Sequence, residues 1–172
     1  NDLFKFSEKH KIKLASIEDL ISYRLQYEKL ITKVSSKHIL LKKSEKVLIH
    51  SYKNKLENNV NYAITKGKLS PKKSTPVRVL STKIKNKNIL KNKEIKKSLN
   101  LLTKYKDYLL LIIYNSNKIK DNNINTLRYY GIGAQIIKDL KVKNMILISR
   151  GRKKIIGLEG FGLKIKKQKI IK

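Results

Sequence analysis

An unbroken apolar run at residues 108–114 constrains the fold of this chain more than any other feature. A strand exposed on one face would alternate polar and apolar side chains, so this run predicts a strand buried on both faces. Residues 145–148 predict a second strand of this kind, and we expect the two strands to be adjacent. Apolar side chains at helical spacing lie before the first run and between the two runs: Ile95, Leu99, Leu102 and Tyr105, then Ile132, Ile136, Ile137 and Leu140.

The first half of the chain has a different pattern. Short segments rich in Ile, Val and Leu predict strands, with residues 57–59 as a hairpin tip. These segments are residues 30–34, 39–42, 47–52, 60–65 and 77–80. The second half alternates helix and strand and ends in a strand at 163–165. The sequence therefore predicts an α/β fold, tending toward α+β, with a β-rich first half and an alternating second half.

Residues 1–29 precede this pattern. Residues 2–10 are amphipathic and predict the end of a helix, and the alternation at 12–14 predicts a short strand. Ser16 suits a helix N-cap because Asp19 stands three residues further on, and we expect this helix to reach about residue 29. The chain starts with Asn and lacks the long apolar stretch of a signal peptide, so we expect it to be cut from a longer polypeptide.

The net charge of +30 invites a nucleic-acid-binding hypothesis, because clustered cations neutralise phosphates. However, the excess consists of 37 Lys and only 5 Arg and is spread over every segment. Phosphate and base recognition favours the planar guanidinium fork of Arg. Lys, Ile and Asn, the residues that AT-rich codons encode, are all abundant. We therefore attribute the excess mainly to compositional drift and expect no specific nucleic-acid partner.

The sequence has no cysteine, which excludes disulfides, thiolate metal sites and cysteine nucleophiles. Its three histidines, His10, His38 and His50, are far apart, and their spacing does not predict a metal site. No apolar run approaches the roughly 18 residues that span a bilayer. We therefore expect a cytoplasmic chain with no metal and no membrane partner.

Two long segments carry a family resemblance. SIEDLISYRLQYEKLI (residues 16–31) resembles the segment that joins the two domains of fused 3,4-dihydroxy-2-butanone 4-phosphate synthase/GTP cyclohydrolase II proteins, and residues 2–14 resemble the closing helix and strand of the synthase. LRYYGIGAQIIKDLKVKNMILISRGRKKIIGLEGFGLKI (residues 127–165) is similar to the C-terminal half of GTP cyclohydrolase II. The resemblance implies that residues 1–29 are the end of a synthase domain plus a linker helix, and that 30–172 are a shortened cyclohydrolase II-like domain.

The same resemblance implies that the catalytic metal site is degenerate. The family holds zinc with three cysteines, one that ends an HSEC motif and two in a CDCG motif, and this zinc activates the water that opens the guanine ring. Here residues 80–83, LSTK, occupy the HSEC position, and no CDCG is present. The nucleotide-contacting QEGRGIG segment is replaced by residues 114–118 and a deletion, and Thr126 stands where the family has an acid. The resemblance thus implies a domain without hydrolytic machinery.

Remnants of a nucleotide or phosphate site are implied at four positions. Arg128 stands at the place of the catalytic arginine of the family. Lys154 occupies the place of a nucleotide-contacting lysine, and Ser149 replaces a threonine of the family. Arg78 lies in the strand that leads to the HSEC position. No catalytic residue other than the Arg128 remnant is predicted, and no metal ligand.

The residues themselves add one observation. Gly131 and Gly133 precede a predicted helix, where missing side chains let backbone N–H groups approach a phosphate, although a tight helix start explains them equally well. We expect Arg128, Ser149 and Lys154 to converge on a shallow crevice near the start of that helix. Such a crevice would bind a phosphate or nucleotide weakly at best.

The leading functional hypothesis is a non-catalytic, structural and dimerising tail of a riboflavin-biosynthesis synthase. The resemblance implies that the parent synthase domain, upstream in the same polypeptide, uses magnesium to convert ribulose 5-phosphate to dihydroxybutanone phosphate and formate. Two alternatives stay open. One is residual GTP cyclohydrolase II-type nucleotide binding or hydrolysis through Arg128 and Lys154. The other is a basic nucleic-acid-binding module.

Overall fold

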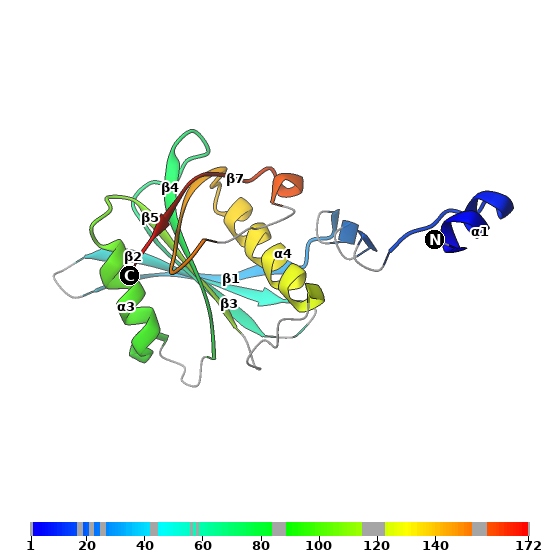
Figure 1. Ribbon diagram of the computed structural model, residues 1–172. Coiled ribbons are helices and arrows are strands. Elements are labelled where there is room, and N and C mark those ends of the chain that lie inside the picture. Colours follow the sequence, from blue (N-terminus) through cyan, green and yellow to red (C-terminus); the bar gives the residue numbers. More distant parts are fainter. Residues whose placement is uncertain are drawn as a thin grey trace.

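The computed structural model describes residues 2–16, 19–20, 23–24, 27–41, 45–55, 57, 59–83, 89–114, 123–152 and 158–171, with the backbone alone described at 123–128 and 159. A single mixed sheet dominates this part of the chain (Figure 1). Its strands are β1 (Ile31–Leu40), β2 (Lys46–Asn54), β3 (Val60–Lys66), β4 (Ser74–Thr82), β5 (Tyr108–Tyr114), β6 (Asn144–Ser149) and β7 (Lys164–Ile170). The helices are α1 (Asp2–His10), α3 (Lys93–Leu102) and α4 (Asn123–Asp139), with 3-10 turns at Ile89–Lys91 and Glu159–Phe161.

The order of the strands across the sheet is β1-β2-β3-β5-β4-β6-β7. The pairs from β1 to β5 are antiparallel, and those from β5 through β4 and β6 to β7 are parallel. The antiparallel half comes from the β-rich first part of the chain, and helices connect strands in the second part. The predicted α/β class is therefore confirmed.

Strand β5 lies at the centre and is buried on both faces, as its unbroken apolar run predicts. Leu109, Leu111 and Ile113 pack into one core cluster with Ile132 and Ile136 of α4. The alternate residues Tyr108, Leu110 and Ile112 pack into a second cluster with Ile95, Leu99 and Leu102 of α3. Because successive strand residues point to opposite faces, the two helices cover opposite faces of the sheet.

Several strand predictions need correction. The strands at 108–114 and 145–148 are both buried, but they are not adjacent, because β4 lies between β5 and β6. The predicted strands 30–34 and 39–42 form one strand, β1, with a bulge at Val34. Residues 12–14 form no strand.

Strand β4 starts at Ser74, ahead of Pro76 and three residues before the predicted strand 77–80. Pairing with β5 begins only at Val77, so Pro76 borders β6 alone and its missing N–H does not interrupt the β4–β5 ladder.

The predicted helix start at Ser16 is confirmed. The Asp19 backbone N–H donates to Ser16 Oγ over 3.0 Å, and the Ser16 N–H donates to Asp19 Oδ2 over 3.3 Å, which is a reciprocal capping arrangement. No residue of α1 is buried. Figure 1 shows α1 lying apart from the sheet. No helix in the described part of the chain is both long and apolar enough to cross a membrane.

Candidate functional site

Arg78 is buried beneath α3. Its side chain is 4% exposed. Nε donates to Ser98 Oγ over 2.8 Å, and Nη1 donates to the Ile148 carbonyl over 3.4 Å. Burial, reinforced by the nearby Arg150 charge and opposed by Glu94, lowers the pKa of the Arg78 guanidinium. These contacts fasten β4 to α3 and β6, and the role of Arg78 as a phosphate-binding remnant stays a prediction.

Ser149 ends β6, and its Oγ donates to the Gly151 carbonyl over 2.7 Å. Strand alternation places Ser149 on the same face as Met145, which packs in the α4 cluster. The side chains of Arg78 and Ser149 therefore lie on opposite faces of the sheet, and the structure does not bring them together. Arg128 lies in α4 with only its backbone described, and Lys154 lies outside the described residues. The convergence of Arg128, Ser149 and Lys154 stays a prediction.

The interpretation of the glycine pair as the start of a helix is wrong. Helix α4 begins at Asn123, so Gly131 and Gly133 lie well inside it and both are buried. Backbone N–H groups at such positions bond within the helix and are not offered to a phosphate. A Cβ at Gly133 would lie 3.4 Å from Leu111 Cδ2, which is an ordinary contact, so Gly133 faces the packed interface between α4 and β5.

The HSEC position falls at the carboxyl end of β4. Residues 80–82 complete that strand, and Lys83 follows it with an exposed side chain. Hydroxyls and an ammonium group do not offer the thiolates that a zinc site of this type uses. Among the described residues, no group of three or more His, Cys, Asp or Glu side chains is placed to hold a metal ion. The residues present therefore do not fit the zinc of the family.

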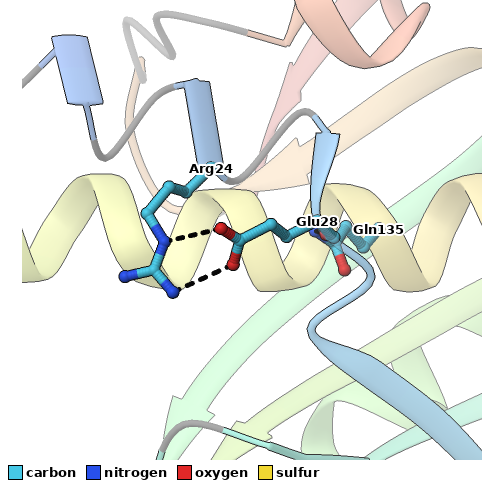
Figure 2. Close-up of polar contacts among 3 residues, drawn as sticks. All are labelled: Arg24, Glu28 and Gln135. Carbon is cyan, nitrogen blue, oxygen red and sulfur yellow. Dashed lines mark hydrogen bonds and ion pairs between the residues drawn. The ribbon is translucent and has the colours of Figure 1, made fainter.

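A polar junction between residues 24–31 and α4 was not predicted from the sequence. Gln135 Nε2 donates to the Glu28 carbonyl over 2.8 Å, and Gln135 Oε1 accepts from the Leu30 N–H over 3.0 Å. Figure 2 shows Gln135 reaching this segment from α4, beside the Arg24–Glu28 ion pair. Leu30 and Ile31 are buried directly after this contact. One amide side chain thus fixes the point at which the N-terminal segment enters the sheet.

Asp139, at the end of α4, is the second anchor of this junction. Its Oδ2 accepts from the Tyr52 hydroxyl over 2.7 Å and lies 2.8 Å from Lys33 Nζ. Burial alone raises the pKa of the Asp139 carboxyl, but the hydrogen bonds from Lys33 and Tyr52 and the charges of Lys33 and Lys29 outweigh burial and hold that pKa below its usual value. Burial and the same carboxylate raise the pKa of the Tyr52 hydroxyl. Asp139 therefore ties α4 to β1 and β2 as an ionised group.

Near Asp139 and Lys33, the side chain of His50 is buried between two hydroxyl side chains. Its Nδ1 lies 2.8 Å from Ser36 Oγ and its Nε2 lies 3.2 Å from Thr65 Oγ1. Burial, reinforced by the Lys33 charge and opposed by Asp139, lowers the pKa of the imidazole. His10 and His38 are exposed. The imidazole of His50 links three strands of the sheet.

A cavity of about 290 Å³ opens at the same junction. The N-terminal segment, the end of α4 and the 3-10 turn line it, through Tyr27, Glu28, Lys29, Ile31, Gln135, Lys138, Asp139 and Phe161. The contacts of Gln135 join residues 105 and 107 positions apart in the chain, so local sequence patterns gave no signal for this cavity.

The fold and this junction define an α/β domain with an N-terminal extension, and Gln135 of α4 holds the end of that extension through hydrogen bonds to Glu28 and Leu30. Residues 89–169 match the family model of GTP cyclohydrolase II. The riboflavin biosynthesis protein RibBA of Aquifex aeolicus is 32% identical over 195 residues, which covers 95% of this chain and 48% of that protein. A 3,4-dihydroxy-2-butanone 4-phosphate synthase of Photobacterium phosphoreum is 30% identical over 179 residues, which covers 93% and 49%.

A solved structure shares the fold. The crystal structure of RibBX, a two-domain 3,4-dihydroxy-2-butanone 4-phosphate synthase from A. baumannii, superposes with a TM-score of 0.68 at 23% identity, covering 99% of this chain and 48% of that one. The chain spans about half the length of the curated relatives it matches. The chain is thus similar to riboflavin-biosynthesis proteins, among them a 3,4-dihydroxy-2-butanone 4-phosphate synthase, and to the GTP cyclohydrolase II family model. The predicted resemblance to riboflavin-biosynthesis proteins is therefore confirmed.

Proposed function

We propose that this chain serves riboflavin biosynthesis as the cyclohydrolase II-like tail of a 3,4-dihydroxy-2-butanone 4-phosphate synthase, and that the tail is structural. The proposal rests on two observations together. A relative named as that synthase aligns with 93% of this chain. This chain has no cysteine that could bind zinc. Without thiolate ligands, the metal-activated water that opens a guanine ring has no site.

The N-terminal segment supports this assignment. Leu3, Phe4 and Phe6 of α1 are 69%, 64% and 56% exposed, and Ile12 and Leu14 are 56% and 47% exposed. A cluster of exposed apolar side chains marks an interaction surface. We propose that residues 1–29 complete a synthase domain that lies upstream in the same polypeptide, and that the rest of that domain covers these side chains. Residues 30–172 are then the shortened cyclohydrolase II-like domain.

In this proposal the reaction belongs to the upstream synthase domain. That domain would convert ribulose 5-phosphate to dihydroxybutanone phosphate and formate with magnesium, and the tail would contribute to a homodimer. Light scattering on the full-length protein and on a version that ends at residue 29 tests the structural part. We expect a dimer in the first protein and a weakened dimer in the second, with synthase chemistry in both. An unchanged dimer would contradict a dimerising tail.

The non-catalytic part is tested with GTP. The purified chain is incubated with GTP and added zinc, formate is measured, and a GTP cyclohydrolase II with its zinc-binding cysteines intact serves as the positive control. We expect no formate from this chain, because the zinc ligands are missing. Formate production that disappears in Arg128→Ala would favour the alternative of residual cyclohydrolase chemistry. Calorimetric titration with GTP measures separately whether any nucleotide binding persists.

A further inference from the structure

The lining of the cavity at the junction holds two ammonium groups and two carboxylates. The Glu28 carboxylate is paired with Arg24, through bonds of 2.8 and 2.9 Å, and the Asp139 carboxylate is paired with Lys33. Lys29 and Lys138 also line the cavity, and neither forms an ion pair among the described residues. Each carboxylate of the lining is therefore already paired with a cation that lies outside the lining.

The remaining lining suits the rest of a small ligand. Tyr27 is 71% exposed and Phe161 is nearly buried, and together with Ile31 they give the cavity apolar surface beside its two ammonium groups. Ligand pockets span roughly 300–1,000 Å³, so a cavity of about 290 Å³ lies at the lower limit. Its size favours a metabolite of a few carbon atoms with one phosphate over a nucleoside triphosphate.

This cavity lies away from Arg128, the predicted remnant on the same helix. Helix α4 rises about 1.5 Å per residue, which places Arg128 about 10 Å from Gln135 and about 16 Å from Asp139 along the axis. Gln135 and Asp139 belong to the carboxyl end of α4, and Arg128 belongs to its amino-terminal half. Lys138 lies ten residues after Arg128, so a ligand held between Lys29 and Lys138 lies about 15 Å along the helix axis from the Arg128 backbone.

We propose that this cavity binds a small phosphate-bearing anion between Lys29 and Lys138. Lysine ammonium groups bind phosphate as point charges. The two lysines that line this cavity lie on different segments of the chain. Lys29 directly follows Glu28, which Gln135 holds, whereas Lys138 lies on α4. An anion between them would strengthen the attachment of the N-terminal segment to α4. Such binding requires no GTP chemistry and no dimer, so its failure would leave the proposed function standing.

The test uses inorganic phosphate as the probe, by calorimetric titration of the whole chain at constant ionic strength. The double variant Lys29→Gln/Lys138→Gln removes both ammonium groups. The control Lys96→Gln/Lys97→Gln removes the same charge from the exposed side of α3, on the opposite face of the sheet. We expect saturable binding in the original chain and in the control, and a loss of about fivefold or more in the junction variant.

A second readout follows the junction itself. Hydrogen exchange at the Leu30 amide, which donates to Gln135, should slow when phosphate is added to the original chain and stay unchanged in the junction variant. Equal loss of affinity in both double variants would show that phosphate responds only to diffuse positive charge and would overturn the proposal. Absence of saturable binding to the original chain would overturn it as well.

Discussion

At the scale of single residues, Asp139 connects three parts of the molecule through one carboxylate. Tyr52→Phe removes the hydrogen bond to Asp139 Oδ2 without changing the ring, which is fully buried. Bonds to charged groups contribute roughly 1.5–3 kcal/mol, but the Asp139 side chain is 32% exposed and water can replace the hydroxyl. We expect Tyr52→Phe to lower the free energy of unfolding by about 1 kcal/mol, measured by urea denaturation.

The ionisation of Asp139 predicts a pH dependence. Because its pKa is lower in the folded chain, the carboxylate stabilises the fold fully above its ordinary value near 3.9, and this contribution is lost as the pH falls through the lower folded value. The stability difference between the original chain and Asp139→Asn should therefore shrink from pH 6 to pH 3. Asp2→Asn on the exposed helix α1 is the control. A difference independent of pH would contradict an ionised, hydrogen-bonded Asp139.

Substitutions at Gly133 test how closely α4 packs on β5. Glycine inside a helix costs roughly 0.5–1 kcal/mol relative to alanine. A Cβ there would meet Leu111 Cδ2 at 3.4 Å and Ile113 Cδ1 at 3.9 Å, which are ordinary contacts. We expect Gly133→Ala to raise the free energy of unfolding by about 0.5 kcal/mol and Gly133→Leu to lower it strongly, in thermal or urea unfolding. A destabilised alanine variant would show that β5 and α4 cannot separate by even a few tenths of an ångström.

At the scale of elements, β5 joins the two cores. Leu111 is fully buried and packs in the α4 cluster. We expect Leu111→Ala to lower the free energy of unfolding by about 2–5 kcal/mol, because it leaves a cavity under the helix. Leu40→Ala is the matched control, since Leu40 is 65% exposed at the end of the edge strand β1, and it should change stability by less than about 0.5 kcal/mol. Equal effects at both positions would contradict a central position of β5.

The sequence predicted which strands are buried better than it predicted their neighbours. An apolar run at 108–114 reports burial on both faces, and the structure shows it. The apolar run does not indicate which strand lies beside it. In the structure β4, which contains a proline, lies between β5 and β6. In β1, the polar stretch Ser35-Ser36-Lys37 looked like a break between two strands. At the edge of a sheet, one face and the outer backbone contact solvent, so polar residues can continue a strand there.

The candidate site shows the same division. Ser16 and Asp19 are three residues apart, so the sequence alone predicted their reciprocal bonds. The contacts that hold the junction join distant residues, and no local pattern at Gln135 or Asp139 indicates their partners. The glycine pair was assigned to the start of a helix because the apolar residues at helical spacing begin at Ile132. Helix α4 nevertheless begins at Asn123 and includes residues 123–130 as well.

At the scale of the whole molecule, the chain divides into a body and an extension. Among the described residues, burial of apolar side chains begins at Leu30 and Ile31, whose exposed fractions are 6% and 2%, whereas no residue of α1 is buried. The extension contacts the body at the junction with Gln135. This division supports a boundary near residue 30, and it implies that the extension contributes little to the stability of the sheet.

Removal of residues 1–29 tests that boundary. Largely exposed apolar side chains gain little burial energy on folding, so the fragment 30–172 should unfold cooperatively with a free energy within about 0.5 kcal/mol of the complete chain. It should also self-associate less, because the exposed side chains of Leu3, Phe4 and Phe6 are gone. The matched control is the fragment 33–172, which lacks Leu30 and Ile31 as well. Losing two buried aliphatic side chains should cost at least about 2–5 kcal/mol, and β1 would also lose its tie to Gln135. Urea denaturation and light scattering of the three proteins measure both effects. A fragment 30–172 as unstable as 33–172 would show that the extension is part of the folded body, and the boundary would then have to lie nearer the amino terminus.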